Sequence, residues 1–179
     1  CDVYQPNLEK GLQAAGGKAK TYTDFRQLLD DKQIDVIINA TPDHWHAIPT
    51  ILACQAGKHV YVEKPAGHNF REGQVMLAAA RKYNRVVQVG IQSRSGQRHA
   101  AACDYVRSGA IGRVMLAKGW ESSWHSPLAY QADSSSLEGL DWDMWLGPAP
   151  ERPFNSNRFD RWEWFFDYGT GELGNDGVH

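Results

Sequence analysis

The chain has 179 residues, enough for one domain of average size and part of a second. Its composition, with 42% hydrophobic and 22% charged residues, is that of a globular protein and excludes a disordered or low-complexity chain. The net charge of -2 excludes the strong field that gathers nucleic acid or anionic lipid, and no apolar run reaches the roughly 20 residues of a membrane helix.

The first half of the chain alternates predicted helices and strands. Helices are expected over residues 6–15 and 25–31, with Thr23 as the N-cap of the second because its hydroxyl suits that position. Residues 34–40 contain a short apolar run rich in β-branched side chains. Such a run is typical of a strand buried on both faces of a parallel sheet.

Further elements of the same kinds follow in the chain. They are a helix around residues 48–56 ended by Gly57, a strand over residues 59–62 stopped by Pro65, a helix that starts with a capping box of Asn69 and Glu72, and a strand over residues 86–90. This alternation predicts βαβ units, a parallel sheet and right-handed crossovers that put helices on both faces. Ligands of such sheets bind at the carboxyl ends of the strands. Here those ends are Asp2 and residues 40–42, 63–65 and 91–92.

The character of the sequence changes after residue 92. Residues 100–107 predict a helix and residues 114–120 a strand. Six of the seven tryptophans lie between residues 120 and 164, among many Gly, Pro, Ser and Asn residues, which is unlike the first half. We therefore predict a parallel-sheet domain over residues 1–92 and the beginning of a second domain over residues 93–179.

The ends of the chain and its cysteines bear on compartment and on metal binding. Residues 1–4 contain neither an initiator methionine nor a signal-like apolar stretch, so we expect the chain to be part of a longer protein. A cytoplasmic location is then the default, and a secreted or periplasmic one stays open. The three cysteines are odd in number, far apart and without CxxC spacing, which predicts neither a disulfide framework nor a metal module.

Three stretches resemble the Gfo/Idh/MocA oxidoreductases, a family named after glucose–fructose oxidoreductase and inositol dehydrogenase. They are residues 41–46 (TPDHWH), residues 63–65 (EKP) and residues 169–179 (GTGELGNDGVH). The resemblance covers nearly the whole chain. It implies an α/β fold, with a Rossmann-type parallel sheet that binds NAD or NADP, followed by an α+β domain whose mostly antiparallel sheet holds a sugar or polyol. The family's first strand and the GxGxxG turn that follows that strand are missing from the sequence, which therefore lacks that phosphate-binding turn.

The resemblance assigns the cofactor to residues at the strand ends. Cofactor contacts are expected at Asp2, Thr41, Pro42, His46, Glu63, Lys64, Pro65 and Gln92. The Asp2 carboxylate would accept hydrogen bonds from the adenosine ribose hydroxyls and repel a 2′-phosphate, which favours NAD over NADP. The alternative for Asp2 is a solvated carboxylate near the chain end.

Two residues are predicted to carry the chemistry. Lys64 is expected beside the nicotinamide, with its ammonium on the reacting hydroxyl, although surface exposure is the commonest fate of a lysine. His179 is expected to exchange the hydroxyl proton, since imidazole titrates near neutral pH. Asn175 stands where the family often has Asp, and this departure removes a carboxylate from that position.

Substrate contacts are predicted at three residues, Arg94, Asn175 and Trp162. An interdomain ion pair is an equal alternative for Arg94. Trp162 and Trp164 would share one face if their segment were extended, and an aromatic face stacks on a sugar, but packing is the alternative for most of the tryptophans. His44 is expected to be solvated. It lies two residues from His46, so the two cannot share a helix face and no metal pair is predicted.

The function predicted on these grounds is that of an NAD-dependent oxidoreductase, with hydride passing between nicotinamide and a carbinol carbon of a sugar, sugar derivative or polyol. Two alternatives stay open. One is an NAD-dependent glycosidase that oxidises, eliminates and re-reduces its sugar, and the other is a non-catalytic dinucleotide-binding sensor. The expected partner is a small carbohydrate or polyol, rather than nucleic acid or a membrane. A homo-oligomer formed through the C-terminal sheet stays open.

Overall fold

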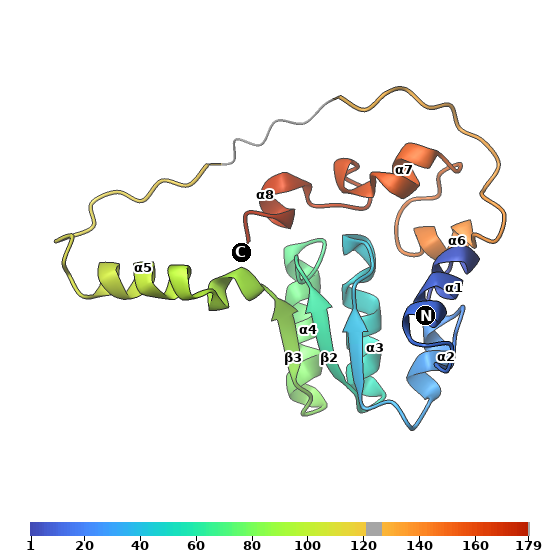
Figure 1. Cartoon of the computed structure of the whole chain (residues 1–179), viewed down its shortest axis with the longest axis horizontal. Coiled ribbons are helices and arrows are strands. Elements are labelled where there is room, and N and C mark those ends of the chain that lie inside the picture. The colour runs from blue at the N-terminus through green and yellow to red at the C-terminus, as the bar shows by residue number, and fades with distance from the viewer. Residues whose placement is uncertain (121–126, 179) are drawn as a thin grey trace.

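The computed structural model describes residues 1–120 and 127–178 (Figure 1). Its strands are β1 (Val36–Asn39), β2 (His59–Glu63) and β3 (Val87–Gly90), which form a parallel sheet in the order β1-β2-β3. Asn39 lies opposite Val62, and Glu63 lies opposite Gly90, so the three carboxyl ends share one edge of the sheet. The predicted parallel sheet is confirmed.

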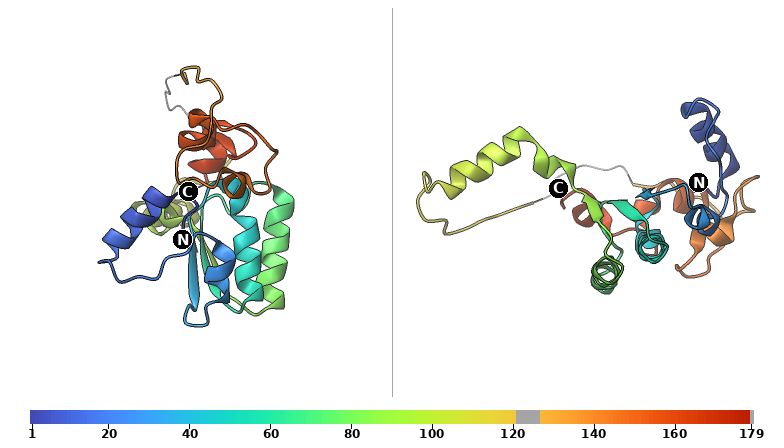
Figure 2. Two further views of the ribbon diagram at one scale, coloured as in Figure 1. Left: turned by 90° about the vertical axis from the view of Figure 1, so that its right-hand side faces the viewer. Right: turned by 90° about the horizontal axis from the view of Figure 1, so that it is seen from below.

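One face of the sheet is covered by the crossover helices α3 (Ala47–Gln55) and α4 (Phe70–Lys82), which lie on the same side (Figure 2). Their apolar faces and the sheet enclose the first hydrophobic core. Its buried members are Leu29, Ala47, Ala53, Cys54, Val60, Val62, Met76 and Ala79. Burial of this apolar surface stabilises the βαβ layer, because the stabilisation grows with the apolar area removed from water.

The opposite face of the sheet is open among the described residues, where Val36 is 56% exposed and Ile38 74%. The predictions that this strand is buried on both faces and that helices lie on both faces are therefore wrong for this part of the chain. The reason is topological. The strands are added in one direction from β1 to β3, and successive right-handed crossovers in one direction place their helices on one side.

The helix ends follow the chemistry of their capping residues. The helix α1 (Gln5–Ala14) has Pro6 in its first turn, and α2 (Phe25–Asp30) is capped by Asp24, whose carboxylate accepts a hydrogen bond from the Arg26 amide at 2.8 Å. The prediction of Thr23 as this N-cap is wrong, because the helix starts one residue later. Gly57 ends α3 with a φ of +80°, as predicted.

The N-cap of α4 is also as predicted. The Asn69 side chain accepts a hydrogen bond from the Glu72 amide at 3.1 Å. The Glu72 carboxylate in turn accepts from the Asn69 side-chain amide at 2.8 Å and from the His68 backbone amide at 2.7 Å. Both partners of the capping pair are therefore engaged at the start of this helix.

The segment after β3 leads away from the sheet. It passes through η2 (Gln92–Ser95) into α5 (Gln97–Arg107), which carries no buried residue (Figure 1). The prediction of a strand over residues 114–120 is wrong, since these residues form none and Leu116 is 82% exposed. A strand needs ladder hydrogen bonds to a neighbour, and no described segment pairs with this one.

The second half forms a separate aromatic core above the strand ends. Its short elements are α6 (Trp142–Leu146), α7 (Ser156–Asp160), η3 (Trp162–Trp164) and α8 (Gly171–Asn175). The buried residues of this core are Leu140, Trp142, Trp145, Leu146, Phe154 and Tyr168. The rings of Trp142 and Trp145 stack with centroids 4.6 Å apart.

In the described ranges, the residues after residue 92 form no strand and take part only in isolated antiparallel bridges. These bridges are Tyr4–Leu140 and Ser134–Phe154. Trp162 and Trp164 form a 3₁₀ turn, so the condition of an extended segment, under which they would share one face, is not met. No helix in the described ranges is long and apolar enough to cross a membrane.

Candidate active site at the carboxyl ends of the strands

The turn after β1 is held by the buried amide of Asn39. This amide donates to the His46 carbonyl at 3.0 Å and to Thr50 Oγ1 at 3.3 Å, while its oxygen accepts from Thr41 Oγ1 at 2.9 Å. An asparagine side chain carries an NH₂ group that donates and an oxygen that accepts. At the end of a strand it can therefore form hydrogen bonds with the polar groups of the following turn. As a result, Thr41 is fixed at the sheet edge.

His46 joins the turns that follow β1 and β2. Its ring is almost fully enclosed, with 1% of the residue exposed. Nε2 lies 2.7 Å from the Thr41 carbonyl oxygen, and Nδ1 lies within hydrogen-bond distance of the Pro65 carbonyl oxygen. The structure thus brings together His46, Thr41 and Pro65, and the imidazole sets the spacing of the two turns.

The Lys64 side chain meets the Gly-rich stretch that the sequence placed more than 100 residues away. Its ammonium donates to Asn175 Oδ1 and to Asp176 Oδ1, both at 2.9 Å. The Lys64 side chain is 20% exposed and that of Asp176 is 55% exposed. Lys64 and Asn175 were predicted site residues, whereas Asp176 was not. The sequence feature that could have identified Asp176 as a site residue is its position directly after Asn175 in the Gly-rich stretch.

Asp43 anchors the start of that stretch to the sheet edge. Its buried carboxylate accepts from both the amide and the hydroxyl of Thr170, each at 3.0 Å. Burial raises the pKa of Asp43, and the hydrogen bonds from Thr170 oppose that rise. His68, after β2, adds a contact at 2.9 Å from its Nε2 to the Phe166 carbonyl oxygen. These anchors hold Asn175 and Asp176 within reach of Lys64.

His44 is enclosed, and the prediction that it is solvated is wrong. It is 3% exposed, and its Nε2 lies 3.0 Å from the Trp145 carbonyl oxygen. Its ring packs against Trp145 and Tyr168 with centroids 5.2 Å and 5.3 Å away. Burial lowers the pKa of His44 to about 4, so the ring is neutral at pH 7. The aromatic core that covers it belongs to the second half of the chain.

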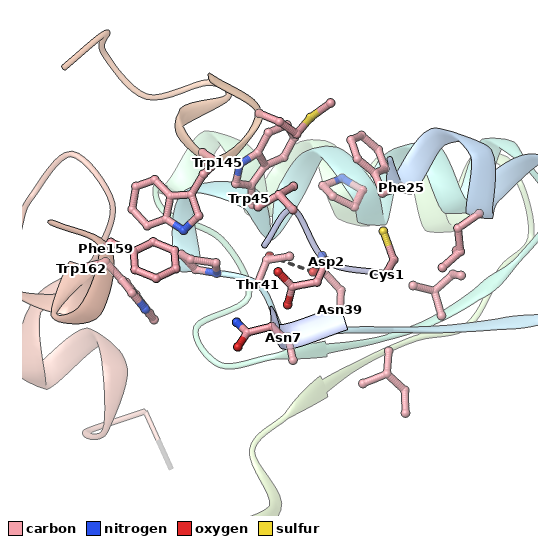
Figure 3. Close-up of a pocket in the computed structure, with 18 of the residues that line it drawn as sticks. Cys1, Asp2, Asn7, Phe25, Asn39, Thr41, Trp45, Trp145, Phe159 and Trp162 are labelled. Atoms are coloured by element: carbon pink, nitrogen blue, oxygen red, sulfur yellow. Dashed lines mark hydrogen bonds between the residues drawn. The ribbon is translucent and has the colours of Figure 1, made fainter. Parts of the chain in front are cut away.

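A cavity of about 550 Å³ lies between the strand ends and the aromatic core (Figure 3). Four predicted site residues line it: Asp2, Thr41, Pro42 and Trp162. The Asp2 carboxylate lies centrally beside Thr41, and its Oδ1 accepts from the Tyr4 amide at 2.9 Å. Phe25, Trp45, Trp145 and Phe159 form the aromatic walls. Convergent polar groups in a largely apolar hollow are typical of small-molecule sites.

A smaller cavity of about 230 Å³ adjoins the Gly-rich stretch. The residues that line it are Arg161, Trp162, Glu163, Trp164, Glu172, Asn175 and Asp176. Trp162 lines both cavities, which makes it the shared wall between them. Arg161 and Glu163 form an ion pair at 3.0 Å in this wall.

The remaining predicted residues lie apart from these cavities. Gln92 stands at the end of β3, where its Oε1 accepts from the Tyr61 hydroxyl at 3.5 Å. Arg94 is exposed in η2 and lines neither cavity. Glu63 accepts from the Lys64 amide at 3.2 Å. The predicted base His179 lies outside the described residues.

Comparisons with known proteins agree with this architecture. A family model described as an oxidoreductase family with an NAD-binding Rossmann fold matches residues 1–91, and the model of the family's C-terminal alpha/beta domain matches residues 112–179. Levoglucosan dehydrogenase of Pseudarthrobacter phenanthrenivorans is 34% identical over 140 residues, which cover 74% of this chain and 36% of that protein. Inositol 2-dehydrogenase of Salmonella typhimurium is 28% identical over 141 residues, which cover 78% of this chain and 42% of that protein.

Solved structures show the same likeness. Levoglucosan dehydrogenase in complex with NADH and levoglucosan superimposes with a TM-score of 0.56 at 33% identity, covering 63% of this chain and 30% of that chain. The myo-inositol 2-dehydrogenase of Lactobacillus plantarum superimposes with a TM-score of 0.58 at 30% identity, covering 64% and 34%. The chain spans 36% to 42% of the length of the two relatives named above. With both family models matched and the strand-end site in place, the chain belongs to the Gfo/Idh/MocA family of oxidoreductases.

Proposed function

We propose that the intact protein containing this chain is an NAD-dependent oxidoreductase of sugars, sugar derivatives or polyols. The observation that carries the proposal is the position of the Lys64 ammonium. It lies 2.9 Å from the side-chain oxygens of Asn175 and Asp176, two residues that line the smaller cavity. Relatives named as dehydrogenases of levoglucosan and inositol support a carbohydrate substrate.

The residues of the larger cavity fit NAD. Its volume of about 550 Å³ lies within the range of about 300–1,000 Å³ seen for small-molecule sites. Asp2 places a carboxylate in it, which suits the donor hydroxyls of a ribose and repels a 2′-phosphate. Thr41 and Pro42 line the same wall. These features favour NAD over NADP. The family's first strand and the GxGxxG turn that follows it are not in this sequence. The GxGxxG pattern at residues 169–174 follows no strand of the parallel sheet, so it is not a pyrophosphate turn of that kind.

The residues around Lys64 account for the charge changes of the reaction. The chemistry that NAD supplies when bound is hydride transfer at its nicotinamide ring. The Lys64 ammonium donates a hydrogen bond to the substrate oxygen and stabilises the negative charge that grows there as the carbinol is oxidised. His46 holds the carbonyls of Thr41 and Pro65, and so positions the turn that carries Lys64. His179 takes the hydroxyl proton in this proposal.

Trp162 and the smaller cavity form the substrate end of the proposed site. The cavity, at about 230 Å³, is below the range of drug-sized pockets and suits a single sugar or polyol ring. An indole face packs well on the C–H surface of such a ring, and the Asn175 side chain offers hydrogen bonds to its hydroxyls. Arg94 lines neither cavity, so its predicted substrate contact has no support from this geometry.

Energy transfer from tryptophan to NADH in the intact protein tests the proposal. Trp45, Trp145 and Trp162 line the larger cavity, so bound NADH should quench tryptophan emission saturably, and NAD should displace it. A screen of sugars, polyols and glycosides should then give net reduction of NAD with an uncharged polyhydroxylated substrate. Glycoside hydrolysis without net reduction would indicate the glycosidase instead, and NADH binding without any turnover would indicate a sensor. The absence of saturable binding of both NADH and NADPH would overturn the proposal.

A further inference from the structure

We propose that Asp176 is the positioning residue for the catalytic ammonium of Lys64. The proposal rests on the function proposed above, because it concerns the same site. Asp176 lies at the C-terminal cap of α8, where its backbone amide donates to the Glu172 carbonyl at 2.8 Å. That contact fixes the backbone from which the carboxylate reaches Lys64.

The number of donors on the ammonium carries the argument. A lysine ammonium has three N–H groups and no acceptor. Two of the three are taken by Asn175 Oδ1 and Asp176 Oδ1, each at 2.9 Å. Two fixed hydrogen bonds stop rotation about the Cε–Nζ bond and leave one N–H in a set direction. This third N–H is the one that meets the substrate oxygen.

The two partners of Lys64 do different work. The Asn175 amide oxygen is neutral, whereas the Asp176 carboxylate pairs its charge with the ammonium. Lysine carries its charge on a flexible four-carbon stem, so a charged partner restricts where that charge resides. Asp176 therefore sets the place and direction of the Lys64 charge, and Asn175 completes the geometry.

The exposure of the pair separates positioning from stability. The Asp176 side chain is 55% exposed, and ion pairs open to water contribute little to the free energy of unfolding. Loss of the Asp176 charge should therefore leave the fold and NADH binding intact. The same loss should slow turnover, since a small displacement of a catalytic group costs up to about 100-fold in rate.

The experiment compares Asp176→Asn with a matched control in the intact protein. The control is Asp104→Asn, which removes a carboxylate from another exposed ion pair, with Arg107 on α5. We expect Asp176→Asn to lower kcat by about 10- to 100-fold, with KM, the Kd of NADH and the melting temperature close to wild type. Asp104→Asn should leave all four unchanged.

A double variant that moves the carboxylate from position 176 to position 175 distinguishes a positioning role from a structural one. In the double variant Asn175→Asp with Asp176→Asn, the carboxylate moves to the other oxygen position that contacts Lys64. We expect this variant to recover most of the lost kcat. A kcat for Asp176→Asn within twofold of wild type would overturn the proposal. The proposal would also be overturned if Asp176→Asn weakened NADH binding, or lowered the melting temperature, enough to account for the lower kcat.

Labelling of Lys64 tests the contact without cofactor or substrate. The rate at which an amine-reactive acylating reagent modifies Lys64 is followed by peptide mass spectrometry. Release from Asp176 should make Lys64 react at least twice as fast in Asp176→Asn and leave the rate unchanged in Asp104→Asn. Unchanged labelling would overturn the positioning role. Faster labelling in a protein that neither binds NADH nor oxidises sugars would instead sink the proposed function and keep the contact.

Discussion

Lys64 shows how a single side chain takes its role from residues that are remote in the sequence. Lysine at a strand end is most often a surface residue. Here its partners Asn175 and Asp176 lie 111 and 112 positions further along the chain. The ammonium is thereby held in place next to two residues of the smaller cavity. In the proposed reaction, one directed N–H group there would stabilise developing negative charge better than a freely moving one.

Replacement of Lys64 by alanine tests its catalytic role. We expect Lys64→Ala to lower kcat by about 100- to 1,000-fold, the cost typical of removing one donor to a developing oxyanion. The Kd of NADH should stay within a few-fold of wild type, because Lys64 lines neither of the two cavities. Lys10→Ala, on the exposed surface of α1, is the control. A loss of NADH binding equal to the loss of turnover would contradict this role.

The buried His44 makes stability depend on pH. Its pKa is lowered to about 4 in the folded protein, while the unfolded chain has the ordinary value of about 6.5. Between these values the unfolded state binds more protons, so the free energy of unfolding falls as pH drops from about 6.5 to 4, by about 3 kcal/mol in all. The stability contributed by neutral His44 is fully present above pH 6.5.

Unfolding by urea at pH 7 and pH 5 measures this effect. In His44→Gln the drop in stability between the two pH values should shrink, while His99→Gln, an exposed histidine on α5, should keep the wild-type drop. The raised pKa of Asp43 acts in the opposite direction at the acid end, because the folded state then binds the extra proton. An equal pH dependence in wild type and His44→Gln would contradict the assignment.

Among the secondary-structure elements, the turns at the sheet edge depend on short polar contacts rather than on apolar burial. Asn39, Thr41 and His46 fix the turn after β1, and Asn69 starts α4 after the turn that follows β2. Capping residues are readable in a sequence because their partners lie two or three positions away. This explains why the Asn69–Glu72 pair was predicted and the carbonyl contacts of His46 were not.

The cap of α4 offers a test at this scale. Asn69→Ala should destabilise the protein by about 1 kcal/mol, because the Glu72 amide loses its acceptor. Asn69→Ser retains a side-chain oxygen at the N-cap and should recover most of the loss. Urea unfolding followed by circular dichroism measures both variants. Equal losses in the two variants would show that the cap hydrogen bond is not the cause.

On the scale of the whole molecule, the second half of the chain closes over the strand ends of the first. The contacts are long in sequence: His44 with Trp145 at 101 positions and Asp43 with Thr170 at 127 positions. The larger cavity owes its walls to this closure, since Trp162 comes from the second half and Thr41 from the first. The site therefore exists only when the two halves are packed together.

A double-mutant cycle on Asp43 and Thr170 measures this coupling. Asp43→Ala and Thr170→Val each break the hydrogen bond between the carboxylate and the Thr170 hydroxyl. We expect the two losses of stability to be non-additive by about 1 to 3 kcal/mol, the value of a hydrogen bond to a charged group. The free energies of unfolding of the four proteins give the coupling directly. Additivity to within about 0.5 kcal/mol would mean that the contact does not join the halves.

Local sequence patterns predicted the helices and strands of the first half and the sheet edge at which the candidate site lies. Alternating apolar runs predicted the parallel strands, the capping pair at Asn69 predicted the start of α4, and the EKP and Gly-rich stretches predicted Lys64 and Asn175 as site residues. These signals are local, because strand periodicity, caps and turns involve residues within about four positions of one another.

The contacts between distant segments could be read only from the folded structure. It left one face of the sheet open, enclosed His44, turned Trp162 and Trp164 into a 3₁₀ turn, and brought Asp176 onto Lys64. The enclosure of His44 and the contact of Asp176 with Lys64 depend on pairing between segments about 100 residues apart. The open face depends on the direction in which strands are added to the sheet. Burial and charge pairing arise from the packing of these segments. A pattern of neighbouring residues does not predict that packing.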